Sequence, residues 1–176
     1  PFLNAGIPIY IDKPLAFTSA EANQLIKLQQ YPWQIFSCSA LRYAQELDIK
    51  KYKSEIGEIK SINATVPKDW DKYAIHAIDP LLLMIPDRGN IVNKMRWAVA
   101  DRVVLNVEFE SGIDIQVSSM GKIDVPISFL VFGSKGWCNI VFSDTFSAFR
   151  GALQKFVDSI NEKETKINSK EMIDAI

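Results

Sequence analysis

Between residues 91 and 142 the chain adopts a period of two, and this pattern restricts the fold more than any other feature of the sequence. Apolar and polar residues alternate from Arg102 to Phe109, and Ser111-Gly112 then turns the chain into another apolar segment. Such alternation is typical of half-buried β-strands. Gly133 to Gly136 has the composition of a hairpin loop between two further strands. The pattern predicts a mainly antiparallel sheet.

Apolar residues at helical spacing mark the segments around this sheet. Thr18 or Ser19 is predicted to cap a helix that runs through Glu21 to Leu28. The other predicted helices cover most of residues 40–53, residues 69–86, residues 146–161 and a short segment from Ser169 to Ile176. Strands are predicted at residues 34–39 and 58–66. The segment 69–86 is apolar around most of its circumference, which indicates a buried helix. The order of elements predicts an α+β fold, a large open sheet with helices on one face.

The amino-terminal residues have a different character. Phe2 to Gly6 reads as the end of a helix with a C-cap glycine, and the apolar strand Ile7–Ile11 follows. A buried strand needs a neighbour, and no earlier strand is present to pair with it. We therefore interpret residues 1–16 as the βα remnant of a nucleotide-binding (Rossmann) domain and residues 17–176 as an α+β substrate-binding and oligomerisation domain.

Composition narrows the classes of function. Twenty basic residues balance twenty-one acidic ones, so no net charge attracts a nucleic-acid backbone. No apolar run reaches the length of a membrane span and no signal peptide is recognisable, so we expect a cytoplasmic protein without membrane contact. Cys38 and Cys138 fall in predicted strands, where buried free thiols are favoured over a disulfide or a metal pair. His76 is the only histidine, and no metal is expected.

Asp12-Lys13-Pro14 follows the carboxyl end of the first strand. Ligands of open α/β sheets bind just beyond the carboxyl ends of strands. An ammonium group there could donate a hydrogen bond to a substrate hydroxyl or stabilise a developing alkoxide. Lys13 is therefore a candidate site residue; the alternative is a surface lysine before a turn proline.

His76 lies within the predicted buried helix, where Lys72, His76 and Asp79 share one stripe. An imidazole titrates near neutrality and can exchange a proton with a hydroxyl group. The alternative is a structural histidine whose ring is capped by Asp79 or by a backbone carbonyl. At Pro80, either Asp79 caps a new helix, or the proline lies in a continuous helix and leaves the carbonyl of His76 without its usual partner.

Arg42 follows the strand that ends at Ser39. An arginine at this place can bind a hydroxylated or carboxylated ligand, or it can form a structural ion pair. The sequence contains no G-x-G-x-x-G fingerprint, no phosphate-binding loop, no nucleophile elbow and no C-x-x-C pair. A hydrolytic triad finds no support.

Asn4 to Ala16 resembles the last strand of the nucleotide-binding domain in the Gfo/Idh/MocA (glucose-fructose oxidoreductase/inositol dehydrogenase) family. That family usually has Ala-Gly, an apolar strand and then Glu-Lys-Pro-Leu-Ala, and here Asp12 replaces the glutamate. Other pieces agree in order along nearly the whole chain: Glu21-Ala22, Leu41-Arg42-Tyr43, Ile56-Gly57-Glu58-Ile59, His76-Ala77-Ile78-Asp79, Phe109-Glu110-Ser111-Gly112 and Phe132-Gly133-Ser134-Lys135-Gly136.

The resemblance implies an enzyme whose amino-terminal Rossmann domain binds NAD or NADP. It also implies a dihydrodipicolinate-reductase-like carboxy-terminal domain that supplies the substrate pocket and the subunit interface. The family's Lys-Pro lysine contacts nicotinamide and substrate, and its helical histidine is the acid/base. These roles fall on Lys13, with Pro14 beside it at the cofactor, and on His76. The family often has an aspartate four residues before this histidine, where this chain has Lys72.

The expected function is therefore the substrate-binding part of an NAD(P)-dependent oxidoreductase that acts on a sugar, a polyol or a related secondary alcohol or ketone. Arg42, Lys72 and Tyr73 are candidate substrate ligands. The chain alone is expected to be inactive, because the glycine-rich phosphate-binding turn is missing. The competing hypothesis is a non-catalytic binding or oligomerisation module, which Lys72 favours. Aromatic and aliphatic residues on more than one face of the sheet predict a homo-oligomer through the open sheet.

Overall fold

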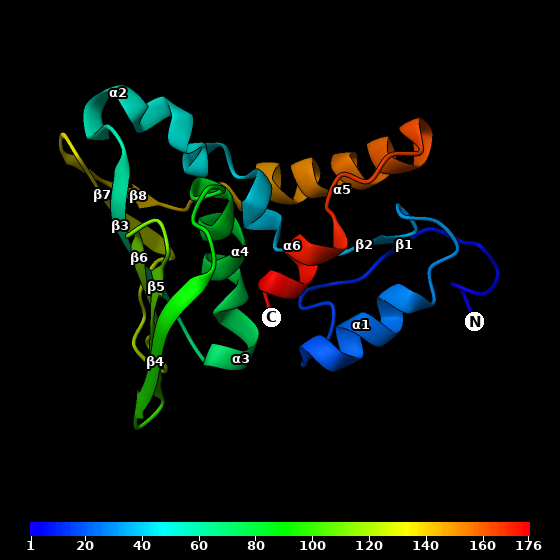
Figure 1. Cartoon of the computed structure of the whole chain (residues 1–176), viewed down its shortest axis with the longest axis horizontal. Coiled ribbons are helices and arrows are strands. Elements are labelled where there is room, and N and C mark those ends of the chain that lie inside the picture. The colour runs from blue at the N-terminus through cyan, green and yellow to red at the C-terminus, as the bar shows by residue number, and fades with distance from the viewer.

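A computed structural model describes the whole chain, residues 1–176, as two lobes (Figure 1). The larger lobe is built on a six-stranded sheet and the smaller on a pair of parallel strands. The helices and strands, in chain order, are β1 (Ile9–Tyr10), α1 (Ser19–Lys27), β2 (Ile35–Phe36), α2 (Lys53–Ile56), β3 (Ile59–Val66), α3 (Trp70–Tyr73), α4 (Ile75–Met84), β4 (Ile91–Val99), β5 (Arg102–Phe109), β6 (Asp114–Ser119), β7 (Ser128–Gly133), β8 (Trp137–Val141), α5 (Thr145–Glu162) and α6 (Ser169–Asp174).

The smaller lobe is a β-α-β unit in which β1 and β2 run parallel, with Tyr10 paired to Phe36. The helix α5 lies over this pair (Figure 1). Its residue Phe156 places its ring centroid 5.7 Å from that of Tyr10 and 5.8 Å from that of Phe36. The pairing of β1 with β2 crosses residue 16, where the sequence predicts the end of the first domain. The division into domains stays a prediction.

The helix α1 begins where the sequence predicts. The hydroxyl group of Thr18 accepts the backbone N–H of Glu21, and the carboxylate of Glu21 accepts the backbone N–H of Thr18. This reciprocal capping box satisfies two N–H groups that the first turn of a helix leaves without partners.

The segment from Ala40 to Lys53 departs from the prediction that it is mostly helical. It consists of short 3₁₀ turns at residues 40–43, 45–47 and 49–52, followed by α2. The side chains of Ser39 and Asp48 each accept the backbone N–H two residues further on, at 3.3 and 3.2 Å. Such local bonds compete with a continuous helix, so the chain folds back in steps.

The predicted helix of residues 69–86 is present as α3 and α4, joined by the helical residue Ala74. Pro80 lies inside α4, so the second of the two alternatives for this proline is correct. Because proline has no N–H, the carbonyl of His76 lacks the usual intrahelical hydrogen bond from position 80.

The six-stranded sheet has the strand order β4-β5-β6-β3-β7-β8. Four of its five strand pairs are antiparallel, and only β3 and β6 run parallel. The helices α3 and α4 lie on one face of the sheet (Figure 1), and the side chains on that face are buried: Ile62, Ala64, Val66, Ile115, Val117, Phe129, Val131 and Ile140. The predicted fold class, an α+β domain with an open, mainly antiparallel sheet, is confirmed.

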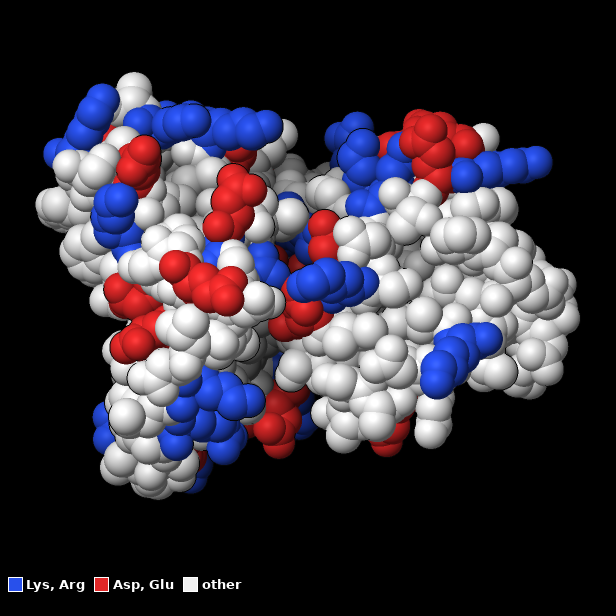
Figure 2. Space-filling view, in the orientation of Figure 1, with Lys and Arg blue, Asp and Glu red and all other residues white.

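The opposite face of the sheet is open. All nine residues of β4 are exposed, among them Met95, Trp97 and Val99. In register, Met95 stands beside Asn106 and Trp97 beside Val104 of β5. A space-filling view shows charged side chains over the larger lobe and around the end of α5, whereas the face of the smaller lobe below α5 is almost free of them (Figure 2).

Cys38 and Cys138 are buried free thiols, as the sequence predicts. Burial raises the pKa of the Cys38 thiol to about 12, so this group is a thiol at neutral pH. No helix combines the length and the apolar character needed to cross a bilayer. No three His, Cys, Asp or Glu side chains come together in a way that could hold a metal ion.

The β7–β8 hairpin makes the tightest glycine contact in the fold. A methyl group added at Gly133 would lie 2.1 Å from the carbonyl oxygen of Ile56. We expect Gly133→Ala to lower the free energy of unfolding by about 1–3 kcal/mol, because backbone must move to admit the methyl group. Urea unfolding followed by circular dichroism measures this loss. Gly112→Asn is the control: no atom lies within 4 Å of its Cβ position, and asparagine tolerates the positive φ of +79° there better than most side chains. Equal losses in the two variants would contradict the packing argument.

Candidate functional site

His76 lies on the first turn of α4, and its ring has one hydrogen-bond partner within the chain. The Nδ1 atom is 2.9 Å from the hydroxyl oxygen of Ser39, which follows the carboxyl end of β2. The Nε2 atom makes no hydrogen bond within the chain, so it is available to a ligand. The predicted capping of this ring by Asp79 or by a backbone carbonyl is not found.

Asp79 instead joins two other groups. Its carboxylate accepts the backbone N–H of Ser39 at 2.7 Å and the guanidinium of Arg42 at 2.6 Å. Arg42 also donates to Glu171 of α6, at 2.7 Å. The side chains of Arg42 and Asp79 are 6% and 3% exposed, so this is a buried ion pair. Removing one partner of such a pair costs about 3–5 kcal/mol.

The geometry therefore favours the structural ion pair, rather than ligand binding, as the role of Arg42. Its two amino groups are occupied by Asp79 and Glu171, and both carboxylates belong to the chain itself. Burial would lower the pKa of Arg42, but the neighbouring carboxylates raise it, so the guanidinium stays charged. A substrate could reach this group only by displacing one of the two carboxylates.

Lys13 extends from the carboxyl end of β1 toward the start of α4. Its ammonium group donates to the carbonyl oxygen of Lys72 at 2.5 Å. That carbonyl lies one helical turn before His76, so the two predicted catalytic residues meet at the same end of α4. Burial lowers the pKa of Lys13. An ammonium group has three donors, and two of them remain for a ligand.

Tyr73 lies between the two. Its ring centroid is 5.7 Å from the ammonium nitrogen of Lys13 and 5.6 Å from the imidazole centroid of His76. Its hydroxyl group accepts a hydrogen bond from Lys68 at 2.6 Å. The ring of Tyr73 therefore lies close to both the lysine and the imidazole.

Lys68 is the site neighbour that sequence reasoning missed. Its ammonium group lies 4.7 Å from the centroid of the Tyr73 ring. The only signal was its place just before the predicted helix, and nothing in that spacing indicates that it returns to Tyr73. Lys72, in contrast, is a predicted site residue whose side chain is exposed. Only its backbone carbonyl takes part in the cluster.

The electrostatics of this cluster keep His76 uncharged. Burial, and after it the positive charge of Lys13, lower the pKa of the imidazole to about 4, while the charge of Asp12 opposes the shift. At neutral pH the ring is therefore a neutral base with a free lone pair or N–H on Nε2. Such a group can take a proton from a hydroxyl or polarise a carbonyl.

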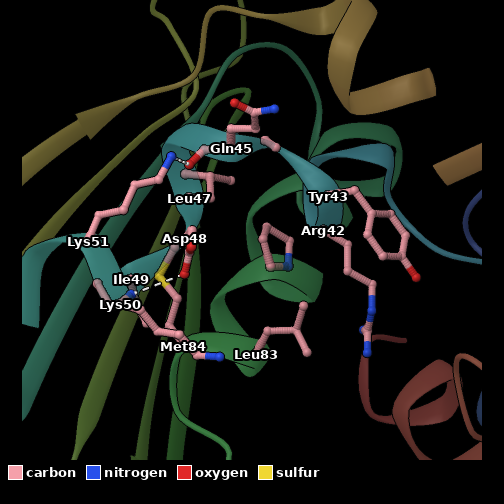
Figure 3. A pocket seen from close by; sticks show the side chains of 12 residues that line it. Arg42, Tyr43, Gln45, Leu47, Asp48, Ile49, Lys50, Lys51, Leu83 and Met84 are labelled. Atoms are coloured by element: carbon pink, nitrogen blue, oxygen red, sulfur yellow. Dashed lines mark hydrogen bonds between the residues drawn. The ribbon is translucent and has the colours of Figure 1, made fainter. Parts of the chain in front are cut away.

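A hollow elsewhere on the chain does not coincide with this cluster. It measures about 650 Å³ and lies between the 3₁₀ turns and the far end of α4, where Figure 3 shows Lys50, Lys51 and Met84 on one side and Arg42 and Tyr43 on the other. The space beside Lys13 is only about 10 Å³. The hollow is lined by Arg42 but contains neither Lys13 nor His76, so the groups that could exchange a proton with a hydroxyl lie outside it.

Comparison with solved structures confirms the predicted resemblance in fold. A myo-inositol 2-dehydrogenase from Lactobacillus plantarum superposes with a TM-score of 0.79 at 17% identity, over 98% of this chain and 69% of that one. A myo-inositol dehydrogenase from Lactobacillus casei in complex with NAD(H) and myo-inositol gives 0.75 at 17% identity, over 96% and 65%. A UDP-N-acetylglucosamine 3-dehydrogenase from Acidithiobacillus ferrooxidans gives 0.76 at 13%, over 98% and 68%.

No family model matches the chain, and no curated protein matches it by sequence. At identities of 13–17% these structures share a fold with the chain, and the chain spans about two thirds of each of them.

The lowered pKa of His76 makes the fold sensitive to acid. In the unfolded chain the ring binds a proton near pH 6.5, and in the folded chain only near pH 4. The stability that this difference provides is complete above pH 6.5 and is lost as the pH falls toward 4. We expect up to about 3 kcal/mol of the acid destabilisation to come from His76.

Urea unfolding of the wild type and of His76→Gln at several pH values checks this expectation. The carboxylates titrate in both proteins, so the difference between the two curves isolates the imidazole. Parallel curves between pH 7 and pH 4 would contradict the assigned shift.

Proposed function

We propose that the chain is the substrate-binding part of an NAD(P)-dependent oxidoreductase that acts on a polyol or sugar. The single observation that carries the proposal is the meeting of Lys13 and His76 on the ring of Tyr73. One hydroxyl-bearing carbon above that ring could contact both groups. The shared fold with inositol and sugar dehydrogenases supports the same class of substrate.

In the proposed reaction His76 accepts the hydroxyl proton on Nε2 when the alcohol is oxidised and returns it when the ketone is reduced. Lys13 donates a hydrogen bond to the same oxygen and stabilises the negative charge that develops there. A neutral base beside a fixed ammonium suits this step, because the cation favours the alkoxide. Tyr73 supports the substrate from below.

Nicotinamide would supply the hydride acceptor or donor in this reaction. Of the chain's own residues, Lys13 and Pro14 are placed to contact its reactive end. The two unused donors of Lys13 fit a carbonyl or hydroxyl oxygen. The glycine turn that binds a dinucleotide pyrophosphate has no counterpart in the sequence, so we assign the rest of the cofactor to residues outside this chain.

Two features of the smaller lobe fit a further α/β unit packed against it. β1 pairs only with β2, and parallel sheets are normally wider and covered on both faces. The exposed side of α5 carries an apolar stripe, Phe146, Phe149, Leu153 and Val157. We propose that a nucleotide-binding unit continues the sheet at β1 and covers this stripe.

A non-catalytic binding or oligomerisation module is the second candidate function. The observation that favours it is the open face of the sheet, with Met95, Trp97 and Val99 exposed along β4. Lys72 also favours it, since no carboxylate stands at that position to orient the histidine. The two functions are compatible in one protein, because the open face and the Lys13–His76 cluster lie on different surfaces.

We expect Lys13→Ala and His76→Ala each to reduce turnover at least about a hundredfold in a protein that joins this chain to a dinucleotide-binding unit. Turnover is measured by nicotinamide absorbance with a panel of inositols and sugars, and NAD and NADP are tested in parallel. Lys60→Ala is the control, because Lys60 forms an exposed surface pair with Glu58. Wild-type rates in both site variants would remove the assignment.

We expect the chain to form at least a dimer through the open sheet. Trp97→Lys should shift the molar mass in size-exclusion chromatography with light scattering toward the monomer, because a charge cannot be buried without a partner. Leu28→Glu, an exposed position on the other lobe, is the control and should leave the mass unchanged. A monomeric wild type at high concentration would argue against this interface.

A further inference from the structure

His76 depends on a hydroxyl group where an acid/base histidine commonly depends on a carboxylate or a carbonyl oxygen. The nearest carboxylate on its own helix, Asp79, is occupied by Arg42 and by the backbone N–H of Ser39. The position one turn earlier is Lys72, whose side chain is exposed and makes no hydrogen bond to the ring. The hydroxyl of Ser39, 2.9 Å from Nδ1, is the only group that contacts an imidazole nitrogen.

Ser39 makes three hydrogen bonds that fix its position, to Asp79, to His76 and to Leu41. It is fully buried, with 0% of its surface exposed. Its backbone N–H donates to the carboxylate of Asp79 at 2.7 Å, and its hydroxyl oxygen accepts the backbone N–H of Leu41 at 3.3 Å. Because Asp79 is in turn fixed by Arg42, the position of the hydroxyl oxygen is set by the buried ion pair.

A hydroxyl group differs from a carboxylate in what it can do for the ring. A carboxylate only accepts, so it requires a proton on Nδ1, whereas a hydroxyl can donate or accept by rotating about one bond. With the ring proton on Nε2, the Ser39 hydroxyl donates to Nδ1. With the ring proton on Nδ1, the same oxygen accepts it through its second lone pair, and Nε2 is left as the proton acceptor.

We propose that Ser39 is the positioning residue of His76, which keeps the imidazole in place through both tautomers and in the protonated state. The catalytic role of this contact rests on the proposed function, whereas the contact between Ser39 and His76 is independent of it. In alcohol oxidation the hydroxyl proton passes to Nε2, and the Nδ1–H of the resulting imidazolium continues to donate to the Ser39 oxygen. In ketone reduction the proton leaves Nε2 and the ring returns to its neutral form in the same position.

The other groups that face the ring do not duplicate this role. Lys13 and Asp12 act on it through their charges from the β1 side, and Tyr73 packs its edge against it. Arg42 and Asp79 act through Ser39. Loss of the hydroxyl should therefore leave Nδ1 without a partner inside the protein.

Because His76 is the only histidine, its nitrogens give one unambiguous pair of resonances in a long-range ¹⁵N–¹H spectrum of the 176-residue chain. In the wild type we expect Nδ1 to show the displacement of a hydrogen-bonded nitrogen. Ser39→Ala should abolish that displacement, and Ser39→Thr should restore it. Ser119→Ala is the matched control: Ser119 is also fully buried and its oxygen also accepts a backbone N–H, but it lies in β6.

An unchanged spectrum in folded Ser39→Ala overturns the inference. So does a wild-type Nδ1 with the resonance of a free nitrogen, and this second measurement needs no variant to fold. In the active protein Ser39→Ala should lower kcat by roughly ten- to hundredfold with little change in KM, as expected for a group that orients a catalytic residue. Altered spectra without any turnover in the wild type would refute the proposed function and leave the positioning role of Ser39 standing.

Discussion

The buried carboxylate of Asp79 is the interaction on which the rest of the site depends. It lies inside α4, and its two oxygens bind the backbone after β2 and the guanidinium of Arg42. Arg42 then reaches Glu171 on α6. Asp79 therefore links α4 to the residue after β2 and to the first 3₁₀ turn, and through Arg42 it also links them to α6. A desolvated carboxylate is tolerated here only because both of its oxygens are paired.

The same arrangement explains why Lys13 and His76 meet although they are 63 positions apart in the sequence. β1 pairs with β2, which places Lys13 beside the strand end that Asp79 holds. α4 begins at that point, so its first turn presents His76 to Ser39 and the carbonyl of Lys72 to Lys13. The site is thus a junction between the two lobes, and its geometry follows from the packing of α4 against the end of β2.

The sequence predicted those parts of this arrangement that local pattern controls. Alternation predicted the strands from residue 91 onward, and Thr18 or Ser19 predicted the start of α1. The short helix predicted from Ser169 is present as α6, which Asn168 caps by accepting the N–H of Glu171. It failed over residues 40–53, because Ser39 and Asp48 bond to nearby backbone and so interrupt the helix that hydrophobic spacing favours. The partners of Asp79 and His76 could not be predicted either, since Ser39 lies 37 residues from His76 and spacing along a helix says nothing of such a contact.

The choice of a hydroxyl partner also bears on the charge of the site. A carboxylate at Nδ1 would stabilise the imidazolium and raise the pKa of His76, whereas Ser39 adds no charge and burial lowers that pKa to about 4. In the proposed reaction the positive charge that assists the alkoxide would be that of Lys13, and the base that takes the proton would start neutral. A carboxylate at position 72 that reached the ring would pair with the imidazolium and raise the pKa of His76. The lysine found there supplies no such charge, so in the proposed site the histidine is held by the geometry of its contact with Ser39 rather than by a carboxylate.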